Sequence, residues 1–175
     1  MTRIFLIGFM GTGKTTLGQA LAKELGLTFC DLDQFIENRY RKSVSQIFKE
    51  SGSDGFHEIE AKLLHEVAQF EDTVIACGGA TPLYYDNMEY MNGQGYTVYL
   101  DTSVDALYRR LVVARAKRPV IAQKTDEELR QFISEELDRR RPFYEKALYH
   151  FCGDKLESIK ELDESVKGLI EQLGL

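Results

Sequence analysis

The sequence predicts an α/β fold in which a parallel sheet is covered by helices on both faces. Short apolar runs of strand length alternate with segments whose apolar residues recur every third or fourth position, as on one face of a helix. A glycine-rich pattern, GFMGTGKTT over residues 8–16, lies between the first apolar run and the first helical segment. Repeated strand–helix–strand order implies parallel strands joined by right-handed crossovers.

Composition indicates one globular domain over residues 1–175. Hydrophobic residues make up 43% and charged residues 29% of the chain, and we find no repeat and no Pro-, Gly- or Ser-rich linker. The net charge of −6 argues against general binding to nucleic acid or to membrane surfaces. A site for an anionic ligand therefore requires a local gathering of Lys and Arg.

The cysteines and the N-terminal run bear on the compartment. Cys30, Cys77 and Cys152 are odd in number and form no CxxC pair, which argues against a disulfide framework or a zinc site. The apolar N-terminal run is short and leads into the glycine-rich pattern rather than into a cleavage site. No run is long enough to span a membrane. We expect a cytoplasmic protein.

The first strand and the first helix are predicted from adjoining segments. Residues 3–8, RIFLIG, form an apolar run that ends at a glycine-rich turn. Leu17, Leu21 and Leu25 then recur at i+4, and Gly26 ends that helix.

Two more strands and a helix follow in the first half of the chain. Residues 27–33, LTFCDLD, predict the second strand, and residues 73–77, TVIAC, predict the third. Between them lies a helix. Its expected apolar face consists of Phe56, Ile59, Leu63, Val67 and Phe70.

The second half continues the same alternation. Residues 96–100 predict a fourth strand, and residues 148–152 predict a weaker fifth. Between them, Thr125 and Glu128 resemble a capping box that opens a long helix running toward Arg141. A C-terminal helix completes the chain. Its expected apolar face consists of Ile159, Leu162, Val166, Leu169 and Leu173.

The glycine-rich pattern predicts a site for a nucleoside triphosphate. Gly8, Gly13, Lys14 and Thr15 match GxxxxGK[ST], with a strand before the loop and a helix after it. Backbone amides and the positive end of the helix face the phosphates, while Lys14 reaches the β- and γ-phosphates and the Thr15 hydroxyl holds Mg²⁺. The expected ATP-binding residues of this loop are Gly11, Thr12, Gly13, Lys14, Thr15 and Thr16.

The loop does not identify the phosphate acceptor, but other features narrow the class. The chain contains no NKxD-type guanine reader and is short for an ATPase with a sensor apparatus. A small kinase of the nucleoside-monophosphate type is the interpretation that remains.

Two carboxylates follow the second predicted strand. Asp31 and Asp33 stand two residues apart in CDLDQ, at the strand end where ligands of such sheets bind. One is suited to supporting Mg²⁺ through its water shell, and the other to accepting the proton of a substrate hydroxyl. The plain alternative is that Asp33 only caps the next helix.

The other candidate groups lie farther along the chain. The glycines of ACGGATP, residues 76–82, allow backbone amides to approach a ligand. The basic segment at 109–120 is expected to close over the triphosphate, with Arg118 stabilising the transferring group and Arg110 stacking on adenine. A second basic cluster lies at 138–144. A solvated helix face is the bland interpretation of both clusters.

Taken together, the motifs resemble the shikimate kinase family. GTGKTT, DLD, FHEIE, GGATP, KRPV and RRPFY occur in that family's order and spacing, from about Arg3 to about Leu173. The resemblance implies a three-layer P-loop fold of nucleoside-monophosphate-kinase type, with a five-stranded parallel sheet of order 2-3-1-4-5. It implies ATP-dependent phosphorylation of the 3-hydroxyl of shikimate, with one Mg²⁺ ion and a monomeric enzyme. A substrate-binding region at about 33–61 and a mobile lid at about 112–124 belong to the same expectation.

The resemblance also implies roles for individual residues. Lys14 and Arg118 contact the phosphates and, with Asp33, are the expected catalytic residues. Thr15 holds the metal, which Asp31 supports through water. The expected acceptor-binding residues are Asp33, His57, Glu60, Gly78, Gly79 and Arg140.

Two positions depart from the family pattern, both on the acceptor side. The family has FRxxE where this chain has FHEIE, so His57 replaces an Arg that clamps the substrate carboxylate, while Glu60 is retained one turn away. Histidine lacks the bidentate fork of arginine, and a lost charge-assisted hydrogen bond costs about 1.5–3 kcal/mol. A surface helix residue is the bland interpretation of His57. Ala80 replaces the third glycine of GGG, at a cost on the order of 1 kcal/mol if that position needs φ > 0.

Two alternatives stay open from the sequence. One is a related kinase that acts on another small hydroxy acid such as gluconate, which the altered FHEIE motif favours. The other is a nucleotide-binding protein without transfer activity, against which the retention of Lys14, Asp33 and Arg118 argues.

Overall fold

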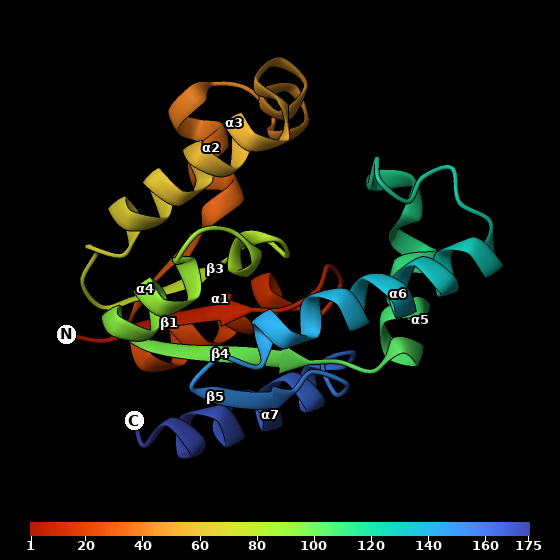
Figure 1. The fold of residues 1–175 in the computed structure, drawn as a ribbon. Helices are drawn as coiled ribbons and strands as arrows, with labels where there is room; N and C mark the ends of the chain where they lie inside the picture. The colour runs from red at the N-terminus through yellow and green to blue at the C-terminus, as the bar shows by residue number, and fades with distance from the viewer.

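The computed structural model describes residues 1–175 and shows strands and helices in alternation (Figure 1). The strands are β1 (Arg3–Ile7), β2 (Thr28–Asp31), β3 (Thr73–Ala76), β4 (Tyr96–Asp101) and β5 (Tyr149–Cys152). The α-helices are α1 (Lys14–Leu25), α2 (Leu32–Tyr40), α3 (Val44–Val67), α4 (Asn87–Gln94), α5 (Val104–Ala114), α6 (Asp126–Tyr144) and α7 (Ile159–Leu173). Short 3₁₀ turns are η1 (Thr81–Leu83) and η2 (Arg115–Lys117).

All five strands form one parallel sheet in the order β2-β3-β1-β4-β5, which confirms the predicted fold class and strand order. The central strand β1 pairs with β3 and β4, and Ile4 lies opposite both Val74 and Tyr96. The fifth strand was predicted as the weakest. It lies at an edge of the sheet, and its side chains alternate between partly buried and exposed.

The sheet separates two apolar cores because successive side chains of a strand point to opposite faces. Ile4 and Leu6 pack with α1 and α7 in one core. Phe5 and Ile7 pack in the other, larger core, to which α2, α3, α4, α5 and α6 contribute. The fold is therefore three layers, helices–sheet–helices, as the sequence predicts.

Local signals place several helix ends where the sequence predicts them. Gly26, with φ 67°, ends α1 in the left-handed conformation that glycine adopts without penalty. The Thr125–Glu128 capping box opens α6 with both reciprocal hydrogen bonds. That helix continues past Arg141 to Tyr144, with Pro142 inside its last turn.

Three details of the predicted helices are wrong. Phe70 lies beyond the end of α3 and is exposed, so it does not belong to that apolar face. Ile159 is 90% exposed, because it is the first residue of α7 and lies beyond the core that the rest of that helix covers. The second helix begins two residues earlier than an N-cap at Asp33 would place it: Asp31 is its N-cap and accepts a hydrogen bond from Gln34 N at 3.1 Å.

Helix α3 also extends farther toward the N-terminus than its apolar periodicity indicates. Its first half ends at Gly52, whose φ of 71° and ψ of 178° break the helical path. This break turns the preceding segment away from the axis of the second half, and Figure 1 shows it at the top of the molecule.

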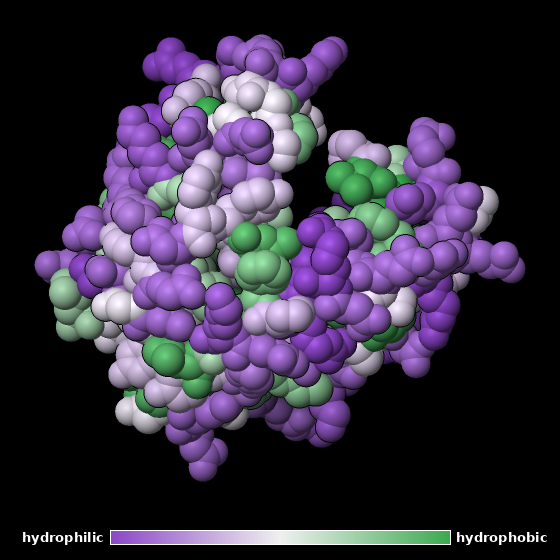
Figure 2. Space-filling model, viewed as in Figure 1, coloured by the Kyte–Doolittle hydropathy of each residue, from purple (hydrophilic) through white to green (hydrophobic).

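The carboxyl ends of the strands point toward a hollow between two projecting parts of the molecule. One part contains α2 and α3, and the other contains the segment between α5 and α6 (Figure 1). The space-filling view shows the hollow open to solvent, with hydrophilic residues along much of its rim (Figure 2). No helix is both long enough and apolar enough to cross a membrane.

Candidate active site

The loop between β1 and α1 has the backbone conformation of a phosphate cradle. Gly8, Gly11 and Gly13 have φ of 147°, 81° and 93°, a region that disfavours residues with a Cβ. Gly13 is the N-cap of α1, so the first free amides of that helix face the end of the loop. The loop predicted from GFMGTGKTT therefore has the backbone shape of an anion-binding site.

Lys14 binds the backbone of the loop from within. Its Nζ donates hydrogen bonds to Gly8 O at 2.8 Å and to Phe9 O at 2.9 Å. Burial lowers the pKa of Lys14 to about 8, and the nearby Asp33 carboxylate opposes that shift. A bound polyphosphate would restore a strong preference for the charged ammonium, because an opposite charge favours the charged form.

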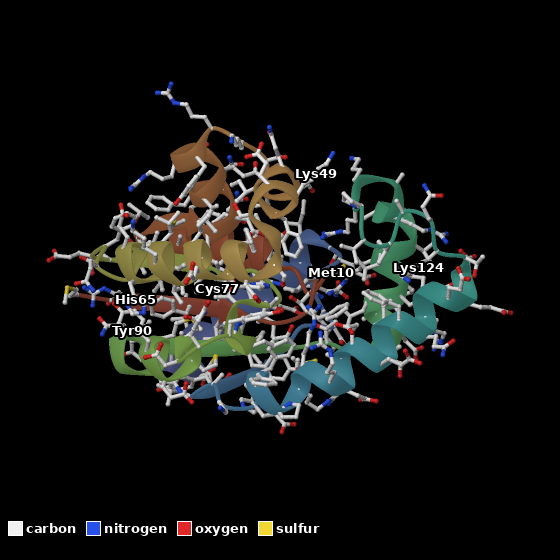
Figure 3. The ribbon with its side chains drawn as sticks, turned by 45° about the horizontal axis from the view of Figure 1, so that its top comes forward. Met10, Lys49, His65, Cys77, Tyr90 and Lys124 are labelled. Atoms are coloured by element: carbon white, nitrogen blue, oxygen red, sulfur yellow. The ribbon has the colours of Figure 1, made fainter.

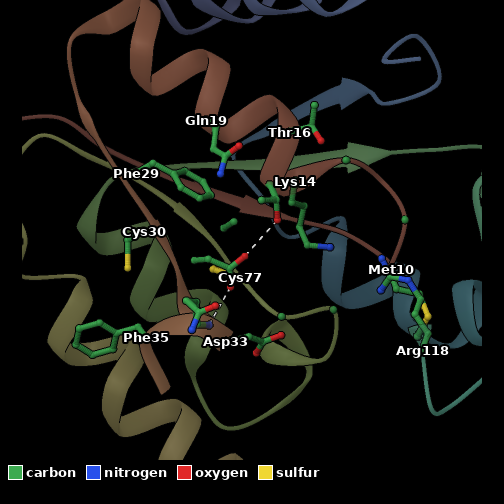
Figure 4. Close-up of a pocket in the computed structure, with 18 of the residues that line it drawn as sticks. Met10, Lys14, Thr16, Gln19, Phe29, Cys30, Asp33, Phe35, Cys77 and Arg118 are labelled. Carbon is green, nitrogen blue, oxygen red and sulfur yellow. Dashed lines mark hydrogen bonds between the residues drawn. The ribbon is translucent and has the colours of Figure 1, made fainter. Parts of the chain in front are cut away.

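The residues expected to hold Mg²⁺ lie together at the start of α1 and the end of β2. Thr15 Oγ1 donates a hydrogen bond to Asp31 Oδ2 at 3.2 Å, shown among the dashed lines in Figure 4. Both groups supply hard oxygen atoms, which Mg²⁺ prefers, and both line the cleft described below. One hydroxyl and one carboxylate suit an ion that keeps most of its waters and binds substrate phosphates.

Asp33 lies in the first turn of α2, facing the same cleft as Lys14 (Figure 4). Burial raises the pKa of the Asp33 carboxyl to about 6, and the negative charges of Glu60 and Asp31 add to the shift. An environment that raises the proton affinity of a carboxylate near neutral pH suits it to accept a proton. Asp33 is therefore not merely a helix cap, which was the plain alternative.

Gly78 and Gly79 line the cleft immediately after β3. A Cβ on Gly78 would stand 3.1 Å from Glu60 Oε2 and 3.4 Å from Asp33 Oδ1. A Cβ on Gly79 would stand 3.3 Å from Arg140 Nη1. Side chains at these two positions would therefore crowd Glu60 and Asp33 on one side and Arg140 on the other.

Arg140 is held close to this glycine pair from α6. Its Nε and Nη2 donate to Glu136 Oε2 at 3.1 and 2.9 Å, and its guanidinium lies 5.2 Å from the centre of the Phe9 ring. On the same helix, Tyr144 donates its hydroxyl to Gly79 O at 2.5 Å. Helix α6 is thus tied to the segment that follows β3.

The two other predicted arginines lie at the nucleotide end of the cleft. Arg110 donates to the carbonyls of Gly11, Thr12, Gly153 and Asp154 at 2.8–3.4 Å, so it joins the phosphate loop to the loop after β5. These bonds use the edge of the guanidinium and leave its flat faces for stacking on a base. Arg118 follows η2 and lines the cleft near Met10 (Figure 4).

His57 and Glu60 are buried, with 4% and 2% of their surfaces exposed. His57 Nδ1 and Glu60 Oε1 are hydrogen-bonded at 3.1 Å, and Thr81 Oγ1 donates to Glu60 Oε2 at 2.8 Å. The interpretation of His57 as a surface residue is wrong, because the core of α3 and the Tyr84 ring enclose it.

The cleft has a volume of about 1040 Å³ and collects most of the predicted site. The predicted residues that line it are Gly11, Gly13, Lys14, Thr15, Thr16, Asp31, Asp33, Gly78, Gly79, Arg110 and Arg118. The predicted residues that do not line it are Thr12, His57, Glu60 and Arg140. His57 and Glu60 lie behind its wall, next to Gly78 and Thr81.

Several lining residues were not predicted. They are Met10, Gln19, Phe29, Cys30, Gln34, Phe35, Glu37, Asn38, Ala76, Cys77, Leu156 and Glu157. Leu156 and Glu157 come from the segment after β5, and the rule that ligands bind beyond the carboxyl ends of the strands points to that segment. Cys30 and Cys77 are free thiols in the cleft whose pKa burial raises, so they are poor nucleophiles.

The arrangement combines a polyphosphate cradle, cations and one proton acceptor in a single cleft. Lys14, Arg110 and Arg118 provide the local positive charge that an acidic chain needs in order to bind an anion. Asp33 lies beside the glycine pair, its Oδ1 3.4 Å from the place where a Cβ on Gly78 would stand. Transfer of a phosphoryl group to a hydroxyl requires these parts, mainly positioning and charge stabilisation.

Comparison with known proteins agrees with this chemistry. A family model described as "Shikimate kinase" matches residues 10–173. The shikimate kinase of Phocaeicola vulgatus is 56% identical over 174 residues, which are 99% of this chain and 99% of that protein. The crystal structure of shikimate kinase from Bacteroides thetaiotaomicron has a TM-score of 0.97 at 49% identity and covers 99% of each chain. Shikimate kinase from Acinetobacter baumannii, solved in complex with shikimate, has a TM-score of 0.85 at 32% identity and covers 99% of this chain and 94% of that one.

Proposed function

The chain belongs to the shikimate kinase family, and from this premise we propose how its own residues perform that family's reaction. The protein is a small-molecule kinase that phosphorylates shikimate with ATP. The observation that carries the proposal is that Lys14, Asp33 and the Gly78–Gly79 pair line the same cleft as the phosphate loop.

On the nucleotide side, the triphosphate lies in the cradle formed by the loop glycines. Lys14 exchanges its two loop carbonyls for phosphate oxygens, and Arg118 neutralises charge on the transferring group. Thr15 would hold Mg²⁺ directly and Asp31 would hold it through water. When bound, the ion neutralises charge on the β- and γ-phosphate oxygens.

On the acceptor side, shikimate lies against the glycine pair. Arg140 binds the carboxylate, because its fork matches two carboxylate oxygens, and the Gly79 amide supplies a further donor. Asp33 accepts a hydrogen bond from the reacting 3-hydroxyl. His57 and Glu60 support this wall from behind.

The reaction is an in-line displacement. The 3-hydroxyl oxygen forms a bond to the γ-phosphorus while the bond to the β–γ bridging oxygen breaks, and ADP leaves with that electron pair. The hydroxyl proton passes to Asp33, whose raised proton affinity suits this task. The products are shikimate 3-phosphate and ADP.

A coupled assay of ADP release against a panel of hydroxy acids tests the proposal. We expect release to depend on shikimate and to be absent with gluconate, whose kinase was the alternative from sequence. Lys14→Ala should abolish release while leaving the folded protein intact by circular dichroism. Equal rates with gluconate, or release that needs no acceptor, would contradict the proposal.

A further inference from the structure

Two tyrosine–histidine stacks join α3 to the segment that follows β3. His57 and Tyr84 lie with ring centres 3.4 Å apart and planes at 14°, and His65 and Tyr90 lie 3.6 Å apart with planes at 3°. The first pair lies behind the part of the cleft wall that contains Gly78 and Gly79, called the acceptor wall below. The second lies toward the far end of α3, away from the cleft (Figure 3). The molecule therefore contains one stack next to the site and a chemically matched stack away from it.

The His57 ring of the first stack is buried and is held by contacts on several sides. Phe48 and Phe56 contact the ring at steep angles, Tyr84 covers one face, and Nδ1 is bonded to Glu60. A ring held in this way has little freedom to turn toward a ligand.

Glu60 is engaged in the same way. Its two oxygens take one hydrogen bond each, Oε1 from His57 and Oε2 from Thr81, and the residue is 2% exposed. An acidic side chain that is buried and bonded on both oxygens serves as a tie between two parts of the chain rather than as a surface for a ligand. It ties α3 to the 3₁₀ turn after the glycine pair.

The Gly78–Tyr84 segment is therefore fixed from two sides. From α3, Glu60 holds its middle and His57 holds its end at Tyr84. From α6, the Tyr144 hydroxyl holds the carbonyl of Gly79. Gly78 and Gly79, which line the cleft, lie at the start of this segment, so its placement determines where their backbone lies.

We propose that Tyr84, through its stack on His57, is a positioning residue for the acceptor: it holds the Gly78–Gly79 backbone in the place where shikimate binds. The inference rests on the function proposed above. Neither ring needs to touch the substrate. The nucleotide end of the cleft is built from the β1–α1 loop and from Arg110 and Arg118, and neither ring of the stack contacts these residues, although Gly79 itself adjoins Gly8 and Met10 of that loop.

Steady-state kinetics of two Tyr84 variants test the role. Tyr84→Leu removes the aromatic face and should raise the KM for shikimate about twofold to twelvefold, since such pairs contribute about 0.5–1.5 kcal/mol beyond area burial. The KM for ATP should change by less than about twofold, because neither ring of the stack contacts the phosphate loop. Tyr84→Phe keeps the stacking face, and the Tyr84 hydroxyl makes no hydrogen bond that could be lost. This variant should therefore keep the wild-type KM for shikimate.

Tyr90→Leu is the control, because it removes the other tyrosine–histidine stack on α3. It also removes the two hydrogen bonds of the Tyr90 hydroxyl, with Gln69 Nε2 and His65 O, and Tyr90→Phe measures that loss separately. Tyr90→Leu should lower the melting temperature without changing either KM. If Tyr84→Leu behaves in the same way, or raises both KM values equally, the stack is merely structural and the positioning role is wrong.

Two His57 variants distinguish the contribution of the Tyr84 stack from that of the hydrogen bond to Glu60. His57→Phe keeps the stack and loses the bond to Glu60, whereas His57→Gln keeps a donor for Glu60 and loses the stack. We expect the larger rise in shikimate KM from His57→Gln. The opposite order would assign the positioning to Glu60 alone and overturn the role of Tyr84.

Hydrogen exchange tests the inference independently of the acceptor. Tyr84→Leu should speed exchange of the amides in 78–83 and leave the phosphate loop at 8–16 unchanged, because local protection reports local packing. Unchanged exchange in 78–83 would overturn the inference even if wild-type turnover is normal. Failure of the wild type to phosphorylate shikimate, with this exchange pattern present, would instead contradict only the proposed function.

Discussion

At the residue scale, the fold opposes the negative charge of Asp33, the residue that we propose as the proton acceptor. Its carboxyl faces the acceptor end of the cleft, and burial together with Glu60 and Asp31 raises its pKa to about 6. A group held in this way is a better proton acceptor near neutral pH, but the folded state loses stability whenever the group is ionised. Catalysis and stability therefore make opposite demands on this side chain.

We predict that Asp33→Asn stabilises the protein at pH 8 while abolishing turnover. In the unfolded chain an Asp titrates near pH 4, so below that pH the proton is bound in both states and no penalty exists. The penalty grows as pH rises toward 6 and is fully present above it, on the order of 2 kcal/mol for a shift of this size. Thermal unfolding at pH 4 and pH 8 measures the difference.

The exposed Asp54 provides the control for that measurement. Asp54→Asn should give no pH-dependent gain in melting temperature. If the stabilisation by Asp33→Asn is equal at both pH values, ionisation of Asp33 is not the cause.

Ala80 does not have the positive φ that would have made alanine costly at this position. Its φ of −98° and ψ of −9° are ordinary for any residue, so Ala in place of the family's glycine causes no strain. The cost on the order of 1 kcal/mol that a positive φ would have imposed does not arise.

Ala80→Gly should therefore leave the shikimate KM unchanged. It should lower the free energy of unfolding slightly, by about 0.4–1 kcal/mol, because glycine gives the unfolded chain more freedom. Kinetics and denaturant titration measure the two effects. A marked fall in KM would mean that the segment must adopt a conformation that alanine hinders.

At the element scale, α6 links the acceptor wall to the rest of the molecule. Its capping box at Thr125 and Glu128 fixes the first turn, and its last turns carry Arg140 and Tyr144 to the glycine pair. The buried side chains of Leu129, Ile133 and Leu137 hold the intervening turns in the larger core. The helix start and the functional end are thus stabilised by different contacts.

Thr125→Ala should destabilise the protein by about 1 kcal/mol, because an orphan amide of the first turn loses its partner. Thr125→Ser keeps the hydroxyl and should cost much less. Below the unfolding transition, kcat and both KM values should match the wild type, since the core holds the far end of α6. Equal destabilisation by Ser and Ala, measured by thermal denaturation, would show that the hydroxyl is not the source.

At the scale of the whole molecule, the cleft lies between two projecting parts and is open to solvent (Figure 2). The predicted lid at 112–124 is anchored by Ile121, which is fully buried, and by Arg115, which donates to Lys124 O at 2.7 Å and pairs with Asp126 at 2.5 Å. Val120 next to that anchor is exposed. The segment is thus held at Arg115 and Ile121, while the apolar side chain of Val120 is exposed to solvent.

We predict that a non-hydrolysable ATP analogue together with shikimate slows hydrogen exchange in 112–124. Closure over both ligands would exclude water and bring Arg118 onto the transferring group. Helix α7, which packs on the opposite face of the sheet, serves as the internal control. Exchange in 112–124 that is unchanged with both ligands present would remove the lid from the mechanism.

The sequence by itself determined the five strands, the cores of α1, α3, α6 and α7, and the phosphate loop, because these depend on local rules. Leu17, Leu21 and Leu25 fall on one helical face, Gly26 allows the helix to end, and the loop glycines adopt φ values that other residues avoid. Periodicity and backbone freedom depend on residues that are neighbours in the sequence, so the sequence pattern alone is enough to predict them.

Only the tertiary structure decided which polar groups face the cleft and which support it. Nothing near His57 in the sequence indicates that Tyr84 will stack on it, and the charge of Glu60 acts on Asp33 only because folding buries the two together. Burial, stacking and shifts in proton affinity arise from contacts between distant residues and from the exclusion of water. The position of each side chain relative to the cleft is therefore fixed by packing, which no local pattern specifies.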